Sequence, residues 1–213
     1  DHVMGLHRVY CVPIGGSAGD GTYVRFAEAE LWAIVCIESA LNDCCVVGED
    51  LGTVPEAVRT SMNEHGAVRM YVSQFEVEPH RDPILTPIPD DVVASVNTHD
   101  TPTFAGFWKH RDVIERLDRG VVDEASTKGE HAHRDHIRDA ILRGLRAEGR
   151  LEDDEAPSDV LVALLMRLAE SPAPLTIVTL EDLWLEEAPQ NVPGTSWERP
   201  NWRRRMQVSL ERI

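Results

Sequence analysis

Acidic and amide side chains gather at the ends of short apolar runs in this 213-residue sequence. The residues are Glu49 and Asp50, Gln74 and Glu76, Asn97, His99 and Asp100, and Glu181 and Asp182. A protonated carboxylic acid can donate to the leaving oxygen of a glycosidic bond while a second carboxylate attacks or supports the sugar cation. For retention of configuration the two carboxyl groups lie about 5–5.5 Å apart. The pattern indicates part of a carbohydrate-active site, with Glu49 as one candidate for its general acid/base.

The apolar runs before these residues are predicted to be buried strands, because they are short, apolar and followed by polar residues. They cover residues 44–47, 68–75, 92–96 and 175–180. Stretches with helical spacing of apolar side chains lie between them, at residues 26–41, 55–64 and 158–170. Strands that alternate with helices pair in parallel, and ligands bind beyond the carboxyl ends of parallel strands. The polar residues above are therefore expected to meet at one edge of a sheet.

The remaining segments are predicted to carry less regular or more polar structure. Residues 12–23 are rich in glycine and form a long loop, and residues 189–202 form an irregular tail rich in Pro, Asn and Trp. Residues 111–150 are charged on all sides and helical in character. Within them His131, His133 and His136 do not share one helix face, so a solvated surface is the preferred interpretation over a metal site.

Composition narrows the class of protein. The chain is 42% apolar and 27% charged, as expected for a soluble globular protein. Its net charge of −16 argues against nucleic acid as a partner, and no apolar run approaches the ~20 residues of a membrane span. The N-terminal residues show no secretory signal. The four cysteines have no metal-ligand spacing, which predicts reduced, buried thiols and a cytoplasmic protein.

Each candidate residue also has a purely structural interpretation. Glu49 could cap the helix that follows it, and Asp100 could form an Asx turn before Thr101-Pro102. His99 alone is more often a hydrogen-bonded loop histidine than a catalytic one. These alternatives stay open for single residues, and only the whole set favours catalysis.

Several segments, taken together and in order, resemble glycoside hydrolase family 77, the 4-α-glucanotransferases or amylomaltases. The matching segments are Asp1-His2-Val3-Met4-Gly5-Leu6, Asp20-Gly21-Thr22-Tyr23-Val24-Arg25, Gly48-Glu49-Asp50-Leu51-Gly52, Asn97-Thr98-His99-Asp100-Thr101, Asn191-Val192-Pro193-Gly194-Thr195 and Pro200-Asn201-Trp202-Arg203-Arg204. The resemblance implies an α/β chain that forms the C-terminal half of a (β/α)8 TIM barrel, from the end of strand four to strand eight. All 213 residues would belong to one catalytic barrel, with residues 111–157 as a helical insertion.

The resemblance also implies roles for individual residues. Asp1 matches the catalytic nucleophile, Glu49 the acid/base and Asp100 the third carboxylate, which holds sugar hydroxyls. The residues expected to bind substrate are His99, Asp50, Asn97, Gln74 and Asn191. The implied reaction transfers α-1,4-glucan segments between maltooligosaccharides through a glycosyl-enzyme, without a metal or organic cofactor.

The sequence departs from the family pattern in two respects. It begins at the nucleophile, so the N-terminal half of the barrel is expected to be a missing partner, and the isolated chain is expected to have little or no transferase activity. Thr101-Pro102 also stands where many relatives have Asn-Asp. Two alternatives are kept: an α-glucan hydrolase of the α-amylase clan, and a catalytically silent glucan-binding fragment.

Overall fold

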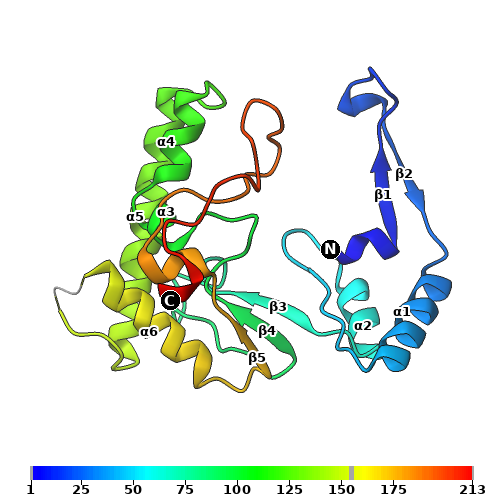
Figure 1. The fold of residues 1–213 in the computed structure, drawn as a ribbon, viewed down its shortest axis with the longest axis horizontal. Coiled ribbons are helices and arrows are strands. Elements are labelled where there is room, and N and C mark those ends of the chain that lie inside the picture. The colour runs from blue at the N-terminus through cyan, green and yellow to red at the C-terminus, as the bar shows by residue number, and fades with distance from the viewer. Residues whose placement is uncertain (1, 154–155, 213) are drawn as a thin grey trace. The chain divides into compact units, whose positions relative to one another are not determined.

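The computed structural model describes residues 2–153 and 156–212 (Figure 1). Contacts divide the chain into two compact units. The first comprises the residues up to Met70 together with Asp91–Val93, and the second comprises Tyr71–Asp90 and the residues from Ala94 onward. In the part of the chain that the structure describes, no helix is both long and apolar enough to cross a membrane.

The first unit begins with a short 3-10 helix and a β-hairpin. The elements are η1 (Val3–Leu6), β1 (Arg8–Cys11), η2 (Ala18–Asp20) and β2 (Thr22–Arg25). β1 and β2 pair antiparallel, and the rings of Tyr10 and Tyr23 meet edge to face at 5.0 Å across the ladder. The glycine-rich loop was predicted, but the strands on either side of it were not. Both strands are largely exposed. A strand is recognised in a sequence by apolar residues on one buried face, and strands without a buried face do not have to show that pattern.

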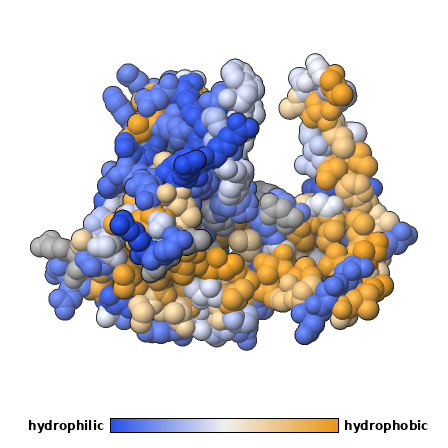
Figure 2. Space-filling view, viewed as in Figure 1, coloured by the Kyte–Doolittle hydropathy of each residue, from blue (hydrophilic) through white to orange (hydrophobic). Residues whose placement is uncertain are grey.

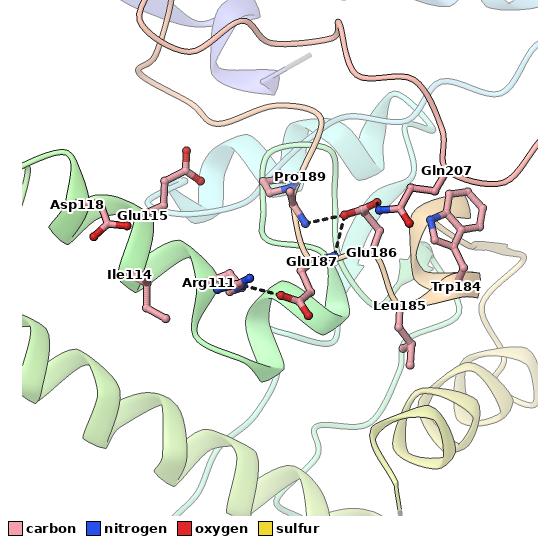
Figure 3. A pocket seen from close by; sticks show the side chains of 11 residues that line it. Arg111, Ile114, Glu115, Asp118, Trp184, Leu185, Glu186, Glu187, Pro189 and Gln207 are labelled. Carbon is pink, nitrogen blue, oxygen red and sulfur yellow. Dashed lines mark hydrogen bonds and ion pairs between the residues drawn. The ribbon is translucent and has the colours of Figure 1, made fainter.

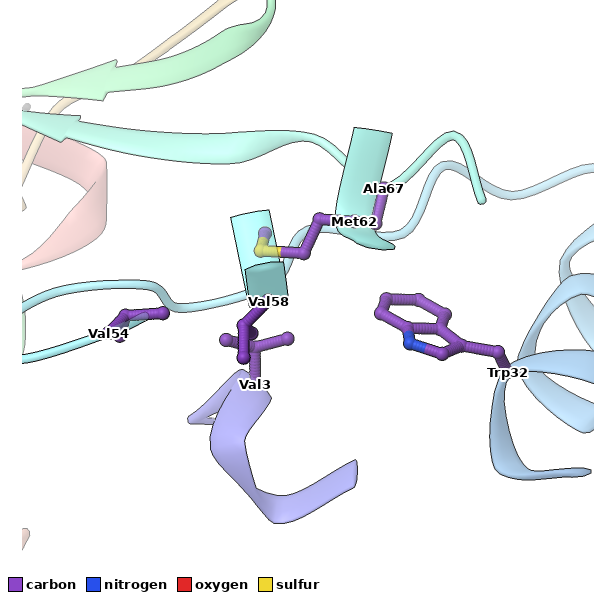
Figure 4. Close-up of a cluster of buried hydrophobic side chains, with 6 residues drawn as sticks. All are labelled: Val3, Trp32, Val54, Val58, Met62 and Ala67. Atoms are coloured by element: carbon purple, nitrogen blue, oxygen red, sulfur yellow. The ribbon is translucent and has the colours of Figure 1, made fainter. Parts of the chain in front are cut away.

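Two helices and η1 enclose the core of the first unit. α1 (Glu28–Asn42) and α2 (Glu56–Glu64) lie where the sequence predicted helices. The core side chains are Val3, Trp32, Val54, Val58, Met62 and Ala67 (Figure 4). Pro55 stands at the N-cap of α2, and Gly66 follows its end with φ +68°. Proline is favoured at a helix start, and glycine readily adopts the left-handed conformation that ends a helix. Both boundaries of α2 could therefore be predicted.

The prediction of a buried strand at residues 44–47 is wrong. Val68 N donates to Val46 O and Gly48 N donates to Val68 O, each at 2.9 Å, and the contact is one parallel bridge between Val47 and Val68. Val47 is 42% exposed. An apolar segment is stabilised when other residues cover it, and its composition is all that the sequence shows. Among the described residues nothing covers residues 44, 45 and 47, so they stay exposed.

The cysteine prediction fails for the same reason. Cys11, Cys44 and Cys45 are exposed and Cys36 is half-buried, and all of them are free thiols. Three of these residues lie in the hairpin or in the uncovered segment before Gly48. The prediction of buried thiols is therefore wrong for Cys11, Cys44 and Cys45.

β3 and β4 run parallel to each other, as the alternation of strands and helices predicted. His2 forms a parallel bridge with Glu49. β3 (Arg69–Val72), β4 (Val92–Ser95) and β5 (Leu175–Ile177) form a sheet in sequence order. Ser73 N donates to Ser95 O and Gln74 N to Val96 O, so the partners advance together along β3 and β4. β4 is buried throughout as predicted, but β5 is not, because Leu175 and Ile177 are about half exposed.

Helices dominate the second unit. They are α3 (Phe104–Trp108), α4 (Arg111–Asp118), α5 (Glu124–Ala147), α6 (Pro157–Ala169), and the 3-10 helices η3 (Leu180–Trp184) and η4 (Leu210–Arg212). The helical character of residues 111–150 and the helix near residues 158–170 are confirmed, but charges do not surround α4 and α5, because Val113, Ile141 and Leu145 are buried. The core includes Phe104, Val113, Leu145, Val160, Leu164 and Leu168. Residues 189–202 contain no helix or strand, as predicted.

Candidate active site

Glu49 lies at the end of the segment that pairs with residues 2 and 3. Val3 N donates to Glu49 O at 2.8 Å, which places the Glu49 backbone in the parallel ladder. Leu51 N donates to Glu49 Oε1 at 2.6 Å, and Glu49 Oε2 lies 3.7 Å from His2 Nδ1. The side chain is 19% exposed. One carboxylate oxygen is thus held by the backbone, while the group keeps access to solvent, as proton exchange with a ligand requires.

Asp50 has the opposite environment, although it is the next residue. Its side chain is 2% exposed and Oδ2 accepts from Arg59 Nε at 3.0 Å and from Arg69 Nε at 3.1 Å. Oδ1 accepts from Met70 N at 3.0 Å. Arg59 also donates to Asp50 O and to Val54 O. These contacts favour a role in holding the loop after Glu49 over the predicted contact with substrate, because no oxygen of Asp50 is left facing solvent.

Asn97, also expected to bind substrate, is buried at the end of β4. Its Nδ2 donates to Asp182 Oδ2 at 2.7 Å, and its Oδ1 accepts from Thr179 Oγ1 at 2.6 Å. It is 3% exposed. Both ends of the amide are engaged by protein, which again favours positioning over ligand contact.

Asp100 and His99 lie in the loop after β4 and are about half exposed. Asn191 Nδ2 donates to Asp100 Oδ1 at 2.5 Å, and His99 Nε2 lies 3.6 Å from the same oxygen. The ring centroid of Trp202 lies 5.9 Å from that of His99. Asp100 N also donates to Thr98 Oγ1 at 3.2 Å. A carboxylate, an imidazole, an amide and an indole thus meet on one accessible surface of the second unit, a combination suited to sugar hydroxyls and sugar faces.

This cluster borders a cavity of about 740 Å³. Asp100 and Asn191 form part of its wall, together with the tail around Val192–Thr195. The cavity is also lined by charged residues of α4 and the turn after it, namely Asp112, Glu115, Arg116 and Arg119. These α4 residues could not be predicted as a cavity wall, because a charged helix face looks the same in the sequence whether it lines a cavity or an ordinary solvated surface.

Gln74, another predicted site residue, is half-buried beside the loop that holds Asp100. Its Nε2 donates to Pro102 O at 3.2 Å, so it supports that loop. Asp1, the predicted nucleophile, lies outside the described residues. Its sequence neighbour His2 is described, and pairs with Glu49 as above.

A second cavity of about 550 Å³ lies between α4 and the segment after η3 (Figure 3). Glu187 accepts from Lys109 Nζ at 2.7 Å and from Arg111, which lowers the Glu187 pKa. Burial raises the pKa of Glu186, but hydrogen bonds from the backbone at Ala188 and the ion pair with Arg204 outweigh it, so this pKa also lies below its ordinary value. Glu186 and Glu187 each form ion pairs with basic side chains, which hold the chain in place just before the tail. Their lowered pKa values make them poor proton donors.

The histidines that the sequence analysis assigned to a solvated face have mixed surroundings. His133 and His136 are exposed, but His131 is half-buried and its Nδ1 lies 2.5 Å from Nδ1 of the buried His110. Burial lowers the pKa of His110, and the nearby charges of Arg138 and Arg134 act in the same direction. His131 therefore belongs to the packing between α4 and α5.

Comparison with solved structures defines the class of fold. The chain superposes on the amylomaltase of Corynebacterium glutamicum with a TM-score of 0.82 and 29% identity, covering 95% of this chain and 30% of that one. An amylomaltase of Streptococcus agalactiae in complex with acarbose gives a TM-score of 0.67 at 20% identity, covering 100% of this chain and 38% of that one. The chain therefore has an α/β fold of the amylomaltase type.

The particular family follows from sequence. A family model described as 4-alpha-glucanotransferase matches residues 1–210, so the chain belongs to this family of transferases. It is 36% identical to the 4-alpha-glucanotransferase of Haemophilus influenzae, over 99% of this chain and 31% of the relative. It is 35% identical to that of Mycobacterium tuberculosis, over 95% of this chain and 29% of the relative. The chain thus spans about 30% of the length of these relatives.

Proposed function

We propose that this chain carries the acid/base and the third carboxylate of an α-1,4-glucan transfer between maltooligosaccharides. Asp1 is the nucleophile, Glu49 the acid/base and Asp100 the carboxylate that holds sugar hydroxyls. His99 and Asn191 contact the same sugar. Membership of the 4-alpha-glucanotransferase family supports the reaction, and the environments of Glu49 and Asp100 support the roles.

The observation that carries the proposal is the parallel pairing of His2 with Glu49. His2 directly follows the proposed nucleophile in sequence, and Val3 N donates to Glu49 O. Neighbouring parallel strands lie about 4.8 Å apart. Residues at the ends of two such strands can therefore hold carboxyl groups at the about 5–5.5 Å that retention requires.

The transfer would proceed in two displacements. In the first, Glu49 gives its proton to the glycosidic oxygen as a carboxylate oxygen of Asp1 attacks the anomeric carbon, and the leaving glucan departs with that proton. In the second, the Glu49 carboxylate takes the proton from an acceptor hydroxyl. The acceptor oxygen then displaces Asp1 from the anomeric carbon, which restores both carboxyl groups and retains the configuration.

We further propose that the parallel strands belong to a (β/α)8 barrel completed by a segment corresponding to the preceding residues of the relatives. Support comes from an uncovered face of α1, where Ile34, Ile37 and Leu41 are 58%, 57% and 74% exposed and recur at helical spacing. Figure 2 shows hydrophobic surface over this part of the first unit. Soluble proteins rarely leave such a stripe open unless another surface packs on it. Residues 111–157 would be an insertion in this barrel.

Completion of the barrel also accounts for the expected inactivity of the isolated chain. A half-barrel exposes strand edges and lacks the loops that exclude water from the glycosyl-enzyme. The isolated chain should release glucose from maltotriose far more slowly than the Haemophilus influenzae relative. Comparable rates would contradict this part of the proposal.

The acid/base role is tested with Glu49→Gln in a polypeptide of the relatives' full length that contains this chain. Transfer from maltotriose should fall by about 100-fold or more, because the amide cannot exchange the proton. Glu64→Gln, at an exposed position of α2, is the matched control and should leave the rate unchanged. Unaltered transfer in Glu49→Gln would rule the role out. Product analysis separates the alternatives, since a transferase makes longer maltooligosaccharides and a hydrolase only shorter ones.

A further inference from the structure

Asp182 is a buried carboxylate on η3 whose two oxygens bind the two ends of one loop. Its Oδ2 accepts from Asn97 Nδ2 at 2.7 Å, and its Oδ1 accepts from Phe104 N at 2.8 Å. Asn97 follows β4 and Phe104 begins α3, so these contacts lie at the boundaries of the loop that carries His99 and Asp100. Asp182 is 2% exposed and has no access to a ligand.

The same segment of chain reaches the loop at other points. Thr179, the N-cap of η3, donates to Asn97 Oδ1 at 2.6 Å, and Thr103 Oγ1 donates to Glu186 O at 2.5 Å. Farther along this segment Asn191 donates to Asp100 itself. One continuous stretch after β5 therefore sets both ends of the loop and contacts its exposed carboxylate.

Both partners of Asp182 are donors, Asn97 Nδ2 and Phe104 N, and the carboxylate offers an acceptor oxygen to each of them. Among the described residues no cation forms an ion pair with Asp182. A buried charge without a cation is costly, and burial raises the Asp182 pKa above its ordinary value. Packing alone would favour an apolar residue here, so we look for the role of this carboxylate in the two groups that it holds, Asn97 and Phe104 N.

We propose that Asp182 is a positioning residue for glucan transfer, which holds the Asn97–Phe104 loop so that His99 and Asp100 face the sugar. This inference rests on the proposed role of Asp100. Asp182 touches neither substrate nor reacting atoms. It acts because displacing a transition-state contact by about 1 Å can cost about 100-fold in rate.

The geometry makes a distinctive prediction for Asp182→Asn. The asparagine oxygen can accept from Phe104 N, and its amide can donate to Asn97 Oδ1 once the Asn97 amide turns over. The Asn97 amide would then donate to Thr179 Oγ1, whose hydroxyl can rotate. Each of the three contacts again joins a donor to an acceptor, so Asp182→Asn should retain kcat within about 5-fold. Asp182→Leu leaves two buried donors without acceptors and should lower kcat by about 100-fold with little change in KM.

The exchange of the two residues tests the contact itself. Asn97→Asp alone sets two buried carboxylates against each other and should lower kcat by about 10-fold or more. Adding Asp182→Asn restores a donor between them, and the double variant should recover to the level of Asp182→Asn. Leu145→Ala, in the core of α5 far along the sequence from the loop, is the control for loss of stability.

All variants are measured in a polypeptide of the relatives' full length that contains this chain, by maltotriose transfer and thermal unfolding. The inference is overturned if Asp182→Leu has the same kcat as a Leu145→Ala variant of equal stability, or if the double variant is no faster than Asn97→Asp. Asp100→Asn is assayed beside them. If Asp100→Asn transfers glucan normally, the proposed role of Asp100 fails, whereas normal transfer by Asp182→Leu alone removes only the positioning role.

Discussion

Asn191 donates a hydrogen bond to Asp100 Oδ1 at 2.5 Å, although 91 residues separate them in the sequence. Asn191 lies in the irregular tail of residues 189–202 and Asp100 lies in the loop after β4, so the bond ties the tail to the proposed third carboxylate. A hydrogen bond to an ionised group is stronger than one between neutral partners. The orientation of the Asp100 carboxylate therefore depends on a segment without regular structure, which is itself held by Asn201 at Val192 and Thr195.

Asn191→Ala should weaken glucan transfer without unfolding the protein. Loss of a hydrogen bond to a charged group costs about 1.5–3 kcal/mol, which corresponds to about a 10- to 100-fold fall in kcat/KM for maltotriose. Asn63→Ala, at an exposed position of α2, is the matched control. Equal kcat/KM for the two variants would show that Asp100 does not need this partner.

Asp182→Asn should remove a loss of stability that the parent protein undergoes as pH rises above about 4. Burial raises the pKa of Asp182 from its ordinary 3.8, although hydrogen bonds from Phe104 N and Asn97 oppose this effect. Because the folded protein binds this proton more tightly, ionisation costs stability as pH rises from about 4 through the folded pKa. The variant escapes that cost, which is about 1.4 kcal/mol for each pH unit that separates the unfolded from the folded pKa. Urea unfolding of both proteins from pH 4 to 8 should show a difference that grows with pH and then levels off; a constant difference would contradict it.

His110→Asn should flatten the acid side of the stability curve. Burial lowers the pKa of His110 below its ordinary 6.5, against the attraction of Asp135. The unfolded chain therefore takes up the proton first, and the parent loses stability as pH falls from about 6.5 through the folded pKa. Asn is chosen because His110 has φ +58°, a left-handed conformation that Asn tolerates.

The measurement for His110 is urea unfolding between pH 7.5 and 5. Ala132→Asn, at an exposed and non-titrating position of α5, serves as the control, and it should keep the pH dependence of the parent. If His110→Asn and Ala132→Asn show the same slope, the titration of His110 does not contribute.

Asp50→Ala should destabilise the first unit severely. Removal of the carboxylate leaves Arg59, Arg69 and Met70 N without their acceptor in a buried site. Breaking such a buried pair costs about 3–5 kcal/mol. Amide exchange of Met70 should accelerate accordingly, whereas Glu64→Ala at the surface of α2 should not change it. A loss below about 1 kcal/mol would indicate that water replaces the carboxylate.

Residues with strong local signals could be predicted from the sequence. Pro55 and Gly66 mark the ends of α2 because proline and glycine restrict or permit the backbone wherever they stand. The run Val92–Ser95 is apolar except for Ser95 and proved to be a fully buried strand. The family motifs that contain Glu49 and Asp100 lie in loops of the described structure, and the family they suggested is confirmed.

Tertiary structure decided what local patterns do not encode. The Glu49 and Asp50 side chains have the same chemistry and adjacent positions, yet only the fold sends Asp50 onto two arginines and leaves Glu49 accessible. Composition marked residues 44–47 as apolar, but their exposure depends on which elements pack beside them. The sequence by itself determined the family, the helices α1, α2 and α6, the buried strand β4 and the candidate carboxylates. Which of them are free to meet a ligand depended on contacts between distant residues, because burial and hydrogen bonding are properties of the folded neighbourhood.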